Sequence, residues 1–226
     1  MNEAIRRKFW LGLEKAHARG AFDVLNAAYT QAHRAYHSWE HIDALLERLE
    51  EFGQLAVRPD LVATAIFWHD VVHVARGSDG ALRLDSENVR DSGDLFRRHT
   101  LLAGREAEAV QDLILATADH MRARARNEYY PGFSGDLDLF IDLDLSPLAS
   151  PWDEFAVNTR KIRSESMGVD EAEFSAKQAA MLEGLAKGGA PLFRRAELRE
   201  KLDATAKVNL ARCIAALRER GAPRRA

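Results

Sequence analysis

The sequence predicts an all-α fold, a bundle of about nine or ten helices. Apolar residues recur at intervals of three and four along most of the 226-residue chain, which is the pattern of amphipathic helices. Clear alternation of polar and apolar residues, typical of a half-buried strand, is missing. A hydrophobic content of 46% is ordinary for a soluble globular protein. We therefore expect one domain over residues 1–226.

In the first half of the chain, the expected helices begin and end at recognisable residues. Ser38 is a good N-cap for a helix that begins at Trp39, and Gly53 follows that helix. Pro59 opens the next helix.

The apolar positions that define the helical runs of the whole chain are Phe9, Trp10 and Leu13; Ile42, Leu45, Leu49 and Phe52; Leu61, Ala65, Trp68 and Val72; Val110, Leu113, Ile114 and Thr117; and Leu202, Leu210, Ile214 and Leu217.

The second half of the chain has its own capping residues. Ser150 before Pro151 predicts a cap with proline in the first helical turn. Residues 170–173 resemble a capping box. Residues 77–85 and 127–135 break the helical pattern. We expect both stretches to be loops, which either face a substrate or simply connect helices at the surface.

Charge and composition disfavour several classes of protein. The formal net charge is −3 and the isoelectric point is near 6.3, so we expect neither a nucleic-acid surface nor a polybasic membrane anchor. Residues 1–8 lack the apolar core of a secretory signal, and no apolar run reaches membrane-spanning length. Cys213 is the only cysteine, which rules out an internal disulfide. We expect a cytoplasmic protein, and the apolar face of residues 204–217 allows a homodimer.

Four separated segments carry side chains that commonly bind metal. Asp70 lies among Ile66, Phe67 and Val71, where an uncompensated carboxylate would be expensive to bury. A divalent cation held by neutral imidazoles and carboxylates would compensate that charge. The sequence therefore predicts a metal site. Its candidate ligands, in chain order, are His37 and His41; His69 and Asp70; His120; and Asp142 and Asp144.

Spacing alone does not decide whether His37 and His73 bind the metal. His41 is favoured over His37 as a helix-borne ligand, because a cap at Ser38 places His37 just outside the helix. His73 follows His69 by one turn. It either binds the same ion or faces solvent or a neighbouring carboxylate.

The roles of His120 and of the Asp142 and Asp144 pair are also undecided by the residues alone. His120 ends an apolar helical run, where it either binds metal, hydrogen-bonds a substrate or interacts with the negative end of the helix. Asp142 and Asp144 lie in a stretch too apolar for an idle acidic pair. One of them is expected to coordinate, and the other could cap a helix beginning near Ser146.

The combined motifs resemble a known family. The matching stretches are Arg34 to Ile42 (Arg-x-Tyr-His-x-x-x-His-Ile), Trp68 to Val72 (Phe-His-Asp-Val-Val), Asp85 to Val89 (Asp-x-Glu-Asn-Val), Ala116 to His120 (Ala-Thr-x-x-His), Asp142 to Ser146 (Asp-x-Asp-Leu-Ser) and Arg163 to Glu165 (Arg-x-Glu). Their order resembles the HD-domain metal-dependent phosphohydrolase superfamily, and more narrowly its bacterial branch of predicted metal-dependent HD phosphohydrolases. The chain departs from that branch at His73, where tyrosine is usual, and in the residues before Asn209.

This resemblance implies an HD-domain-like helical bundle. Its metal-site core would span about residues 30–165, and a C-terminal helical extension would span about 170–220. The defining metal-ligand positions would be His41, His69, Asp70 and Asp144. Asp144 is preferred to Asp142 because the last ligand of the superfamily usually directly precedes a leucine or a comparable helix residue. The cofactor would be a divalent ion: Mn, Mg, Zn, Fe, Co or Ni.

The implied activity is hydrolysis of a small-molecule phosphate ester, such as a nucleotide, by a metal-activated water. Arg34 would neutralise phosphate charge, unless it is a solvated helix charge. Glu87 would position the water or relay its proton, unless it only faces the positive end of its helix. We also assign His120 to catalysis, and His37 and Arg163 to substrate binding.

Two other functions fit the same residues. Some HD-domain proteins use extra histidines to hold two irons and act as oxygenases, and His37, His73 and His120 keep that alternative open. A non-catalytic nucleotide-binding or regulatory helical module is the third interpretation. The intact set of ligand residues argues against it.

Overall fold

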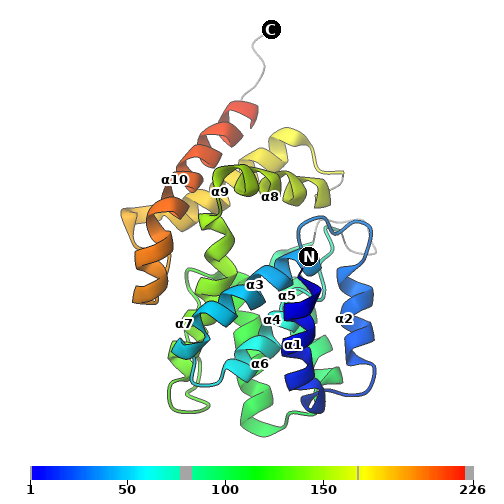
Figure 1. The fold of residues 1–226 in the computed structure, drawn as a ribbon. Coiled ribbons are helices and arrows are strands. Elements are labelled where there is room, and N and C mark those ends of the chain that lie inside the picture. The colour runs from blue at the N-terminus through cyan, green and yellow to red at the C-terminus, as the bar shows by residue number, and fades with distance from the viewer. Residues whose placement is uncertain (1, 77–82, 167, 222–226) are drawn as a thin grey trace. The chain divides into compact units, whose positions relative to one another are not determined.

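The computed structural model describes residues 2–76, 83–166 and 168–221, and within these ranges it is all-α, with ten α-helices and no strand (Figure 1). This confirms the predicted fold class. The helices are α1 (Glu3–Leu13), α2 (Ala21–Tyr29), α3 (Trp39–Phe52), α4 (Pro59–Trp68), α5 (Asp85–His99), α6 (Gly104–Ala116), α7 (Phe133–Leu145), α8 (Trp152–Glu165), α9 (Glu171–Ala186) and α10 (Ala196–Gly221), with short 3₁₀ turns η1 (Glu14–Ala16), η2 (Gly53–Leu55), η3 (Thr117–Asp119), η4 (Ser146–Ala149) and η5 (Lys187–Gly189).

Local capping chemistry sets several of these boundaries as expected. The Ser38 hydroxyl accepts a hydrogen bond from the backbone N–H of Glu40, and α3 begins at Trp39. Pro59 is the first residue of α4. The Asp170 carboxylate accepts the backbone N–H groups of residues 172 and 173 and caps α9. These positions were predictable because each bond is local.

Three expected boundaries differ from the structure. Pro151, not Ser150, occupies the cap position of α8, and the Ser150 hydroxyl instead donates to Glu154 at 3.0 Å. Neither acidic residue of the 142–144 pair caps a following helix, because both lie inside α7 and Leu145 occupies the cap position of η4. The expected loop over 127–135 ends at residue 132, and residues 77–82 of the other expected loop lie outside the described residues.

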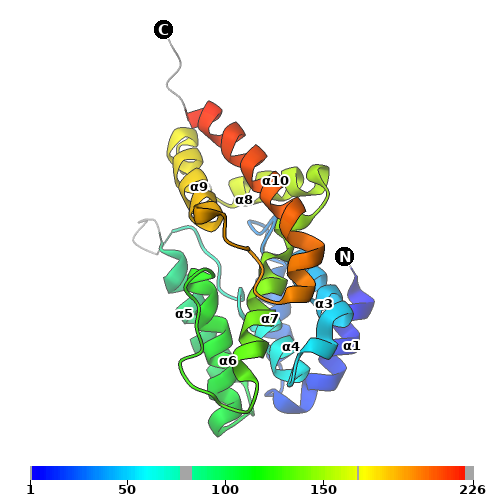
Figure 2. The ribbon, with the colours of Figure 1, turned by 90° about the vertical axis from the view of Figure 1, so that its left-hand side faces the viewer.

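The chain forms two compact units, residues 1–143 and 144–226. In the first unit α4 is the central helix, and every residue from Leu61 to Trp68 is buried. Helices α1, α3, α5 and α6 all contact α4, and α5 and α6 lie side by side (Figure 2). A helix that is apolar all round is stable only when it is surrounded in this way. The first turn of α3 and the residues that directly follow α4 carry the candidate site.

A buried ion pair attaches α1 to α3. The Arg6 guanidinium donates to both Asp43 oxygens at 2.9 and 2.8 Å, and its carbon lies 4.1 Å from the centre of the Trp39 ring. Both charged side chains are almost fully buried. Such a pair needs good geometry and extra hydrogen bonds to offset desolvation, and the backbone N–H of Asn2 supplies one more bond to Asp43.

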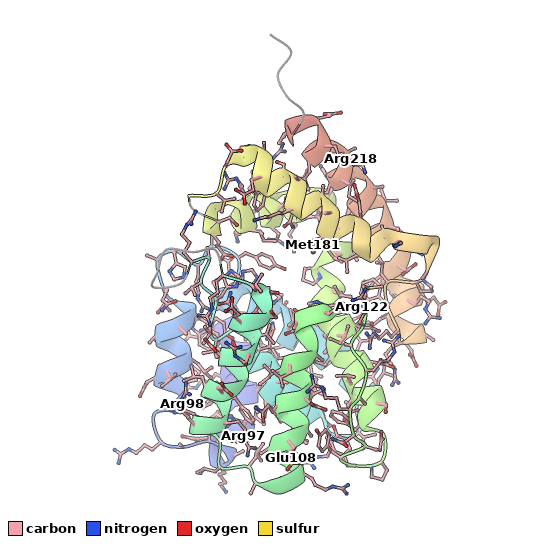
Figure 3. All side chains as sticks on the ribbon, turned by 180° about the vertical axis from the view of Figure 1, so that it is seen from behind. Arg97, Arg98, Glu108, Arg122, Met181 and Arg218 are labelled. Atoms are coloured by element: carbon pink, nitrogen blue, oxygen red, sulfur yellow. The ribbon has the colours of Figure 1, made fainter. Side chains whose placement is uncertain are left out.

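The second unit contains α8, α9 and α10. Helix α10 packs along α9 (Figure 2), and Arg218, labelled in Figure 3, donates to Glu183 of α9 at 2.7 Å. The buried Asn209 amide of α10 donates to the Leu148 and Ser150 carbonyls. Among the described residues, no helix is both long enough and apolar enough to cross a bilayer.

Candidate metal centre

Three of the predicted ligands meet in the first unit. His41 lies in the first turn of α3, and His69 and Asp70 directly follow the last residue of α4. The Nε2 atoms of the two histidines are 3.3 Å apart. The Oδ2 atom of Asp70 lies 3.1 Å from Nε2 of His69 and 3.5 Å from Nε2 of His41. Two segments of the chain, 28 residues apart at His41 and His69, thus bring three donor atoms together in one small triangle.

This triangle has the size of a coordination site. Ligand atoms about 2.0–2.1 Å from a zinc ion in tetrahedral geometry are about 3.3–3.4 Å from one another. The three observed separations, 3.1, 3.3 and 3.5 Å, bracket that value. Two imidazole nitrogens and one carboxylate oxygen suit Zn, Fe or Mn. The three side chains could therefore hold a divalent ion.

His69 is oriented as a metal ligand needs to be. Its Nδ1 atom lies 2.9 Å from the backbone carbonyl oxygen of Ile66. A carbonyl only accepts, so in the neutral ring Nδ1 carries the proton and Nε2 keeps its lone pair. The ring is also packed edge-to-face against Phe140. A hydrogen bond from the far nitrogen is how proteins usually fix the tautomer of a metal-binding histidine.

The two histidines of the site are buried, and the carboxylate is partly exposed. His41 and His69 are 6% and 1% exposed, whereas the Asp70 side chain is 17% exposed. Burial raises the pKa of the Asp70 carboxyl, but the positive charge that His69, His37 and His41 carry when protonated lowers that pKa by more. A metal ion held by neutral imidazoles would favour the ionised carboxylate in the same way.

Arg34 holds the backbone beneath Asp70. Its guanidinium donates to the carbonyl oxygens of Asp70 at 2.7 Å, Val71 at 2.8 Å and His37 at 3.2 Å, and its Nε donates to Gln31. The residue is 7% exposed. These bonds do not fit a solvated helix charge, and they tie the segment before α3 to the end of α4. The role in binding phosphate stays a prediction.

Helix α5 holds the same segment from another side. The buried Asn88 amide donates to the Val74 carbonyl and accepts the Val74 N–H. One turn later, the buried Ser92 hydroxyl bonds both backbone groups of Val72. Sequence reasoning gave neither residue a supporting role, although Asn88 lies in the Asp85 to Val89 motif. The spacing of four between Asn88 and Ser92, which places them on one face of α5, was the indication available for Ser92.

The other predicted histidines lie around this group. The His37 and His73 rings are stacked, with centres 3.7 Å apart, and Tyr36 packs against both His37 and His41. His120 is half-buried and directly follows η3, after the end of α6. Its assignment to catalysis stays a prediction.

Two charged residues that were assigned to the reaction make structural bonds. Glu87 accepts the backbone N–H of Leu84 at 2.8 Å in the first turn of α5, which is the helix-end role left open by the sequence. Arg163 lies in the second unit, where it donates to Glu171 and to the Ser166 and Val169 carbonyls. These bonds link α8 to the described residues that lead into α9.

The fourth ligand is not fixed by these contacts. Asp142 is fully buried in the part of α7 that belongs to the first unit, and Asp144 is the first residue of the second unit. Side chains two positions apart on a helix diverge by about 200°. The two carboxylates therefore face different surroundings, and the choice of Asp144 stays a prediction.

Comparison with known proteins does not place this chain in a family. A scan of family models, a search of curated proteins and a search of solved structures each gave no match. What the chain does must therefore be argued from its own residues.

Proposed function

We propose that this protein is a metal-dependent phosphohydrolase of the HD-domain superfamily, which hydrolyses a small-molecule phosphate ester in the cytoplasm. The observation that carries the proposal is the triangle of His41, His69 and Asp70, whose donor atoms lie 3.1–3.5 Å apart. The motif order found in the sequence supports the same family. Asp144 is the proposed fourth ligand.

The residues of the chain would divide the work as follows. A bound divalent ion would supply a Lewis acid for the phosphoryl oxygen and lower the pKa of a bound water. The Ile66 carbonyl keeps the lone pair of His69 directed at the ion position. The substrate and water would approach from the partly exposed side of Asp70. The His37 imidazole, close enough to Asp70 to lower its pKa, would contact the phosphate.

The test is metal content together with turnover. Elemental mass spectrometry of the untagged protein should find bound divalent metal, and Asp70→Ala should lose it. Asp23→Ala, an exposed aspartate on α2, is the matched control and should keep the metal. The wild type and the control should release phosphate from p-nitrophenyl phosphate or from members of a nucleotide panel. Equal metal content in both aspartate variants would show that Asp70 is not a ligand. Bound metal without release of phosphate from any of these substrates would contradict the proposed hydrolase activity.

A second candidate function is oxidation by a di-iron site. The His37 and His73 rings stack at 3.7 Å, and His37 acts electrostatically on Asp70, so further imidazoles lie near the proposed ligands. Two metals would also suit hydrolysis, so the metal count alone does not decide. Two irons per chain with substrate-dependent oxygen consumption would favour the oxygenase, and phosphate release with no oxygen consumption would favour the hydrolase.

A further inference from the structure

The carbonyl groups at the C-terminal end of α4 are bonded in an unusual way. The last four carbonyls of an α-helix have no partner inside the helix. In α4, groups of residues 69 and 71 bond three of these four carbonyls. The fourth carbonyl, that of Phe67, accepts the hydroxyl of Tyr29 at 2.9 Å. The end of the helix that leads into the candidate metal centre therefore depends on a residue 38 positions earlier in the chain.

Tyr29 lies between the two segments that carry the metal triangle. The residue is 2% exposed, and its ring packs against Trp39, the first residue of α3, with ring centres 4.8 Å apart. Trp39 comes two positions before His41, and Phe67 comes two positions before His69. One side chain thus contacts both segments, in each case two residues ahead of a candidate ligand.

Helix α2, which carries Tyr29, makes two further contacts with the same segments. The carbon of the Arg34 guanidinium lies 5.4 Å from the centre of the Tyr29 ring, within the range of a cation–π contact. That guanidinium donates to two carbonyls that follow α4. Asn26, one turn before Tyr29, accepts the indole N–H of Trp39 at 3.0 Å. Although α2 lies at the edge of the first unit (Figure 1), it bonds the start of α3 and the end of α4.

A hydroxyl that fixes a carbonyl at a helix end also fixes the planar peptide group to which the carbonyl belongs. The next residues along the chain are Trp68 and then His69, so the bond to Phe67 restricts the turn from which the ligands project. We propose that Tyr29 is a positioning residue of the candidate metal centre, whose hydroxyl holds the end of α4 so that His69 and Asp70 direct their donor atoms at one ion. Resting on the function proposed above, this role needs no contact of Tyr29 with metal or substrate.

Two matched substitutions test this role in the full-length chain. Tyr29→Phe removes the hydroxyl and keeps the ring that packs on Trp39. Tyr130→Phe removes a hydroxyl at the opposite end of α4, where Tyr130 donates to Asp136 at 2.8 Å. The same Asp136 carboxylate accepts the backbone N–H groups of residues 57 and 58, directly before α4. Each variant therefore loses one hydroxyl bond near one end of the same helix.

Metal affinity and ligand geometry should change in only one of the two variants. In competition with a chelating indicator, Tyr29→Phe should bind zinc about tenfold more weakly than the wild type, an effect of the size seen for groups that support ligands. Tyr130→Phe should bind zinc like the wild type. With cobalt in place of zinc, the visible absorption bands should change in Tyr29→Phe alone, because those bands depend on the coordination geometry.

Amide hydrogen exchange of the metal-free protein provides a readout that does not require a bound ion. The His69 amide, which donates to Ala65 at 2.9 Å, should exchange faster in Tyr29→Phe and at an unchanged rate in Tyr130→Phe.

Two results would overturn the positioning role: Tyr29→Phe matching the wild type in affinity and cobalt spectrum, or the two variants losing affinity equally. A wild type that binds no divalent metal would instead contradict the proposed function. Unchanged exchange at His69 in Tyr29→Phe would then show that the hydroxyl does not hold the end of α4.

Discussion

At the scale of single residues, the candidate metal centre depends on side chains that bond to backbone carbonyls. Arg34 donates to the Asp70 and Val71 carbonyls, and His69 donates to the Ile66 carbonyl. These bonds fix where the donor atoms point before any ion arrives. Preorganised ligands lose less conformational entropy when they bind, so the supporting groups would contribute to the proposed metal affinity without touching the metal.

Replacing Arg34 by lysine tests this supporting role. An ammonium group cannot span the three carbonyl oxygens that the planar guanidinium reaches. We expect Arg34→Lys to weaken metal binding by about 10–100-fold, as for other residues that support ligands, and to lower the free energy of unfolding by about 1–3 kcal/mol. Competition with a chelating indicator measures the first effect, and urea unfolding measures the second.

The control for this substitution is Arg48→Lys. Arg48 pairs with Glu51 on the exposed side of α3, where a change of cation alters little. Metal affinity should be unchanged in that variant. If Arg34→Lys binds metal as the wild type does while its stability falls, the arginine supports the fold and not the site.

At the scale of elements, two side chains of α5 hold the segment that follows α4 through hydrogen bonds to its backbone. Asn88 bonds both backbone groups of Val74, and Ser92 bonds both backbone groups of Val72. Truncation in Asn88→Ala leaves the Val74 groups without these bonds, at a cost of about 1–3 kcal/mol. We expect faster amide hydrogen exchange at Val74 and weaker metal binding, with unchanged exchange in α2. Unchanged protection of the Val74 amide would contradict this account of the segment.

A buried histidine attaches η1 to α4 and gives a dependence on pH. His17 Nδ1 donates to the Leu13 carbonyl, and its Nε2 accepts the indole N–H of Trp68 at 3.0 Å. The ring must therefore be neutral, and burial lowers its pKa below the ordinary 6.5. At pH values between the lowered pKa of the folded state and the ordinary 6.5, the unfolded chain binds a proton at His17 and the folded chain does not. His17 therefore makes the protein lose stability as the pH falls below about 6.5.

Substituting this histidine isolates the effect. His17→Phe keeps an aromatic ring against Trp68 but removes both the titration and the acceptor. We expect the variant to be less stable than the wild type at pH 7.5, and the difference to shrink as the pH is lowered from 6.5. Urea unfolding followed by tryptophan fluorescence at several pH values measures this. A difference that stays constant over that range would exclude His17 as the titrating group.

The same elements show what the sequence could and could not predict. The Ser38 and Asp170 caps and the start at Pro59 were predictable, because each depends on residues within a few positions. The meeting of His41 with His69 and Asp70 followed from the order of the motifs. The carbonyl bonds of Arg34 and the backbone bonds of Asn88 were not predictable, because contacts 14 to 37 residues apart leave no periodic pattern.

At the scale of the whole molecule, the chain divides into units of residues 1–143 and 144–226, a division that composition alone did not indicate. Helix α7 runs across the boundary, so its apolar pattern is continuous and offers no linker to recognise. The expectation of a single domain stays a prediction. The division nevertheless has a practical use, because the three converging candidate ligands all belong to the first unit.

Tryptophan fluorescence can report on that unit separately. Trp10, Trp39 and Trp68 lie in the first unit, and Trp152 lies in the second, where it stacks on Phe155. Trp152→Phe keeps an aromatic ring there and leaves three tryptophans in the unit that carries the triangle. Its fluorescence transition then follows the unfolding of the first unit.

Metal removal should shift this transition. A ligand that binds only the folded state stabilises it by about 2.7 kcal/mol at a free concentration of one hundred times its dissociation constant. We expect chelation to lower the midpoint of urea unfolding in Trp152→Phe, and added zinc or manganese to restore it. Adding Asp70→Ala to the same protein should abolish the response, because it removes one of the three donor atoms. A chelator effect that persists without Asp70 would place the bound metal elsewhere in the chain.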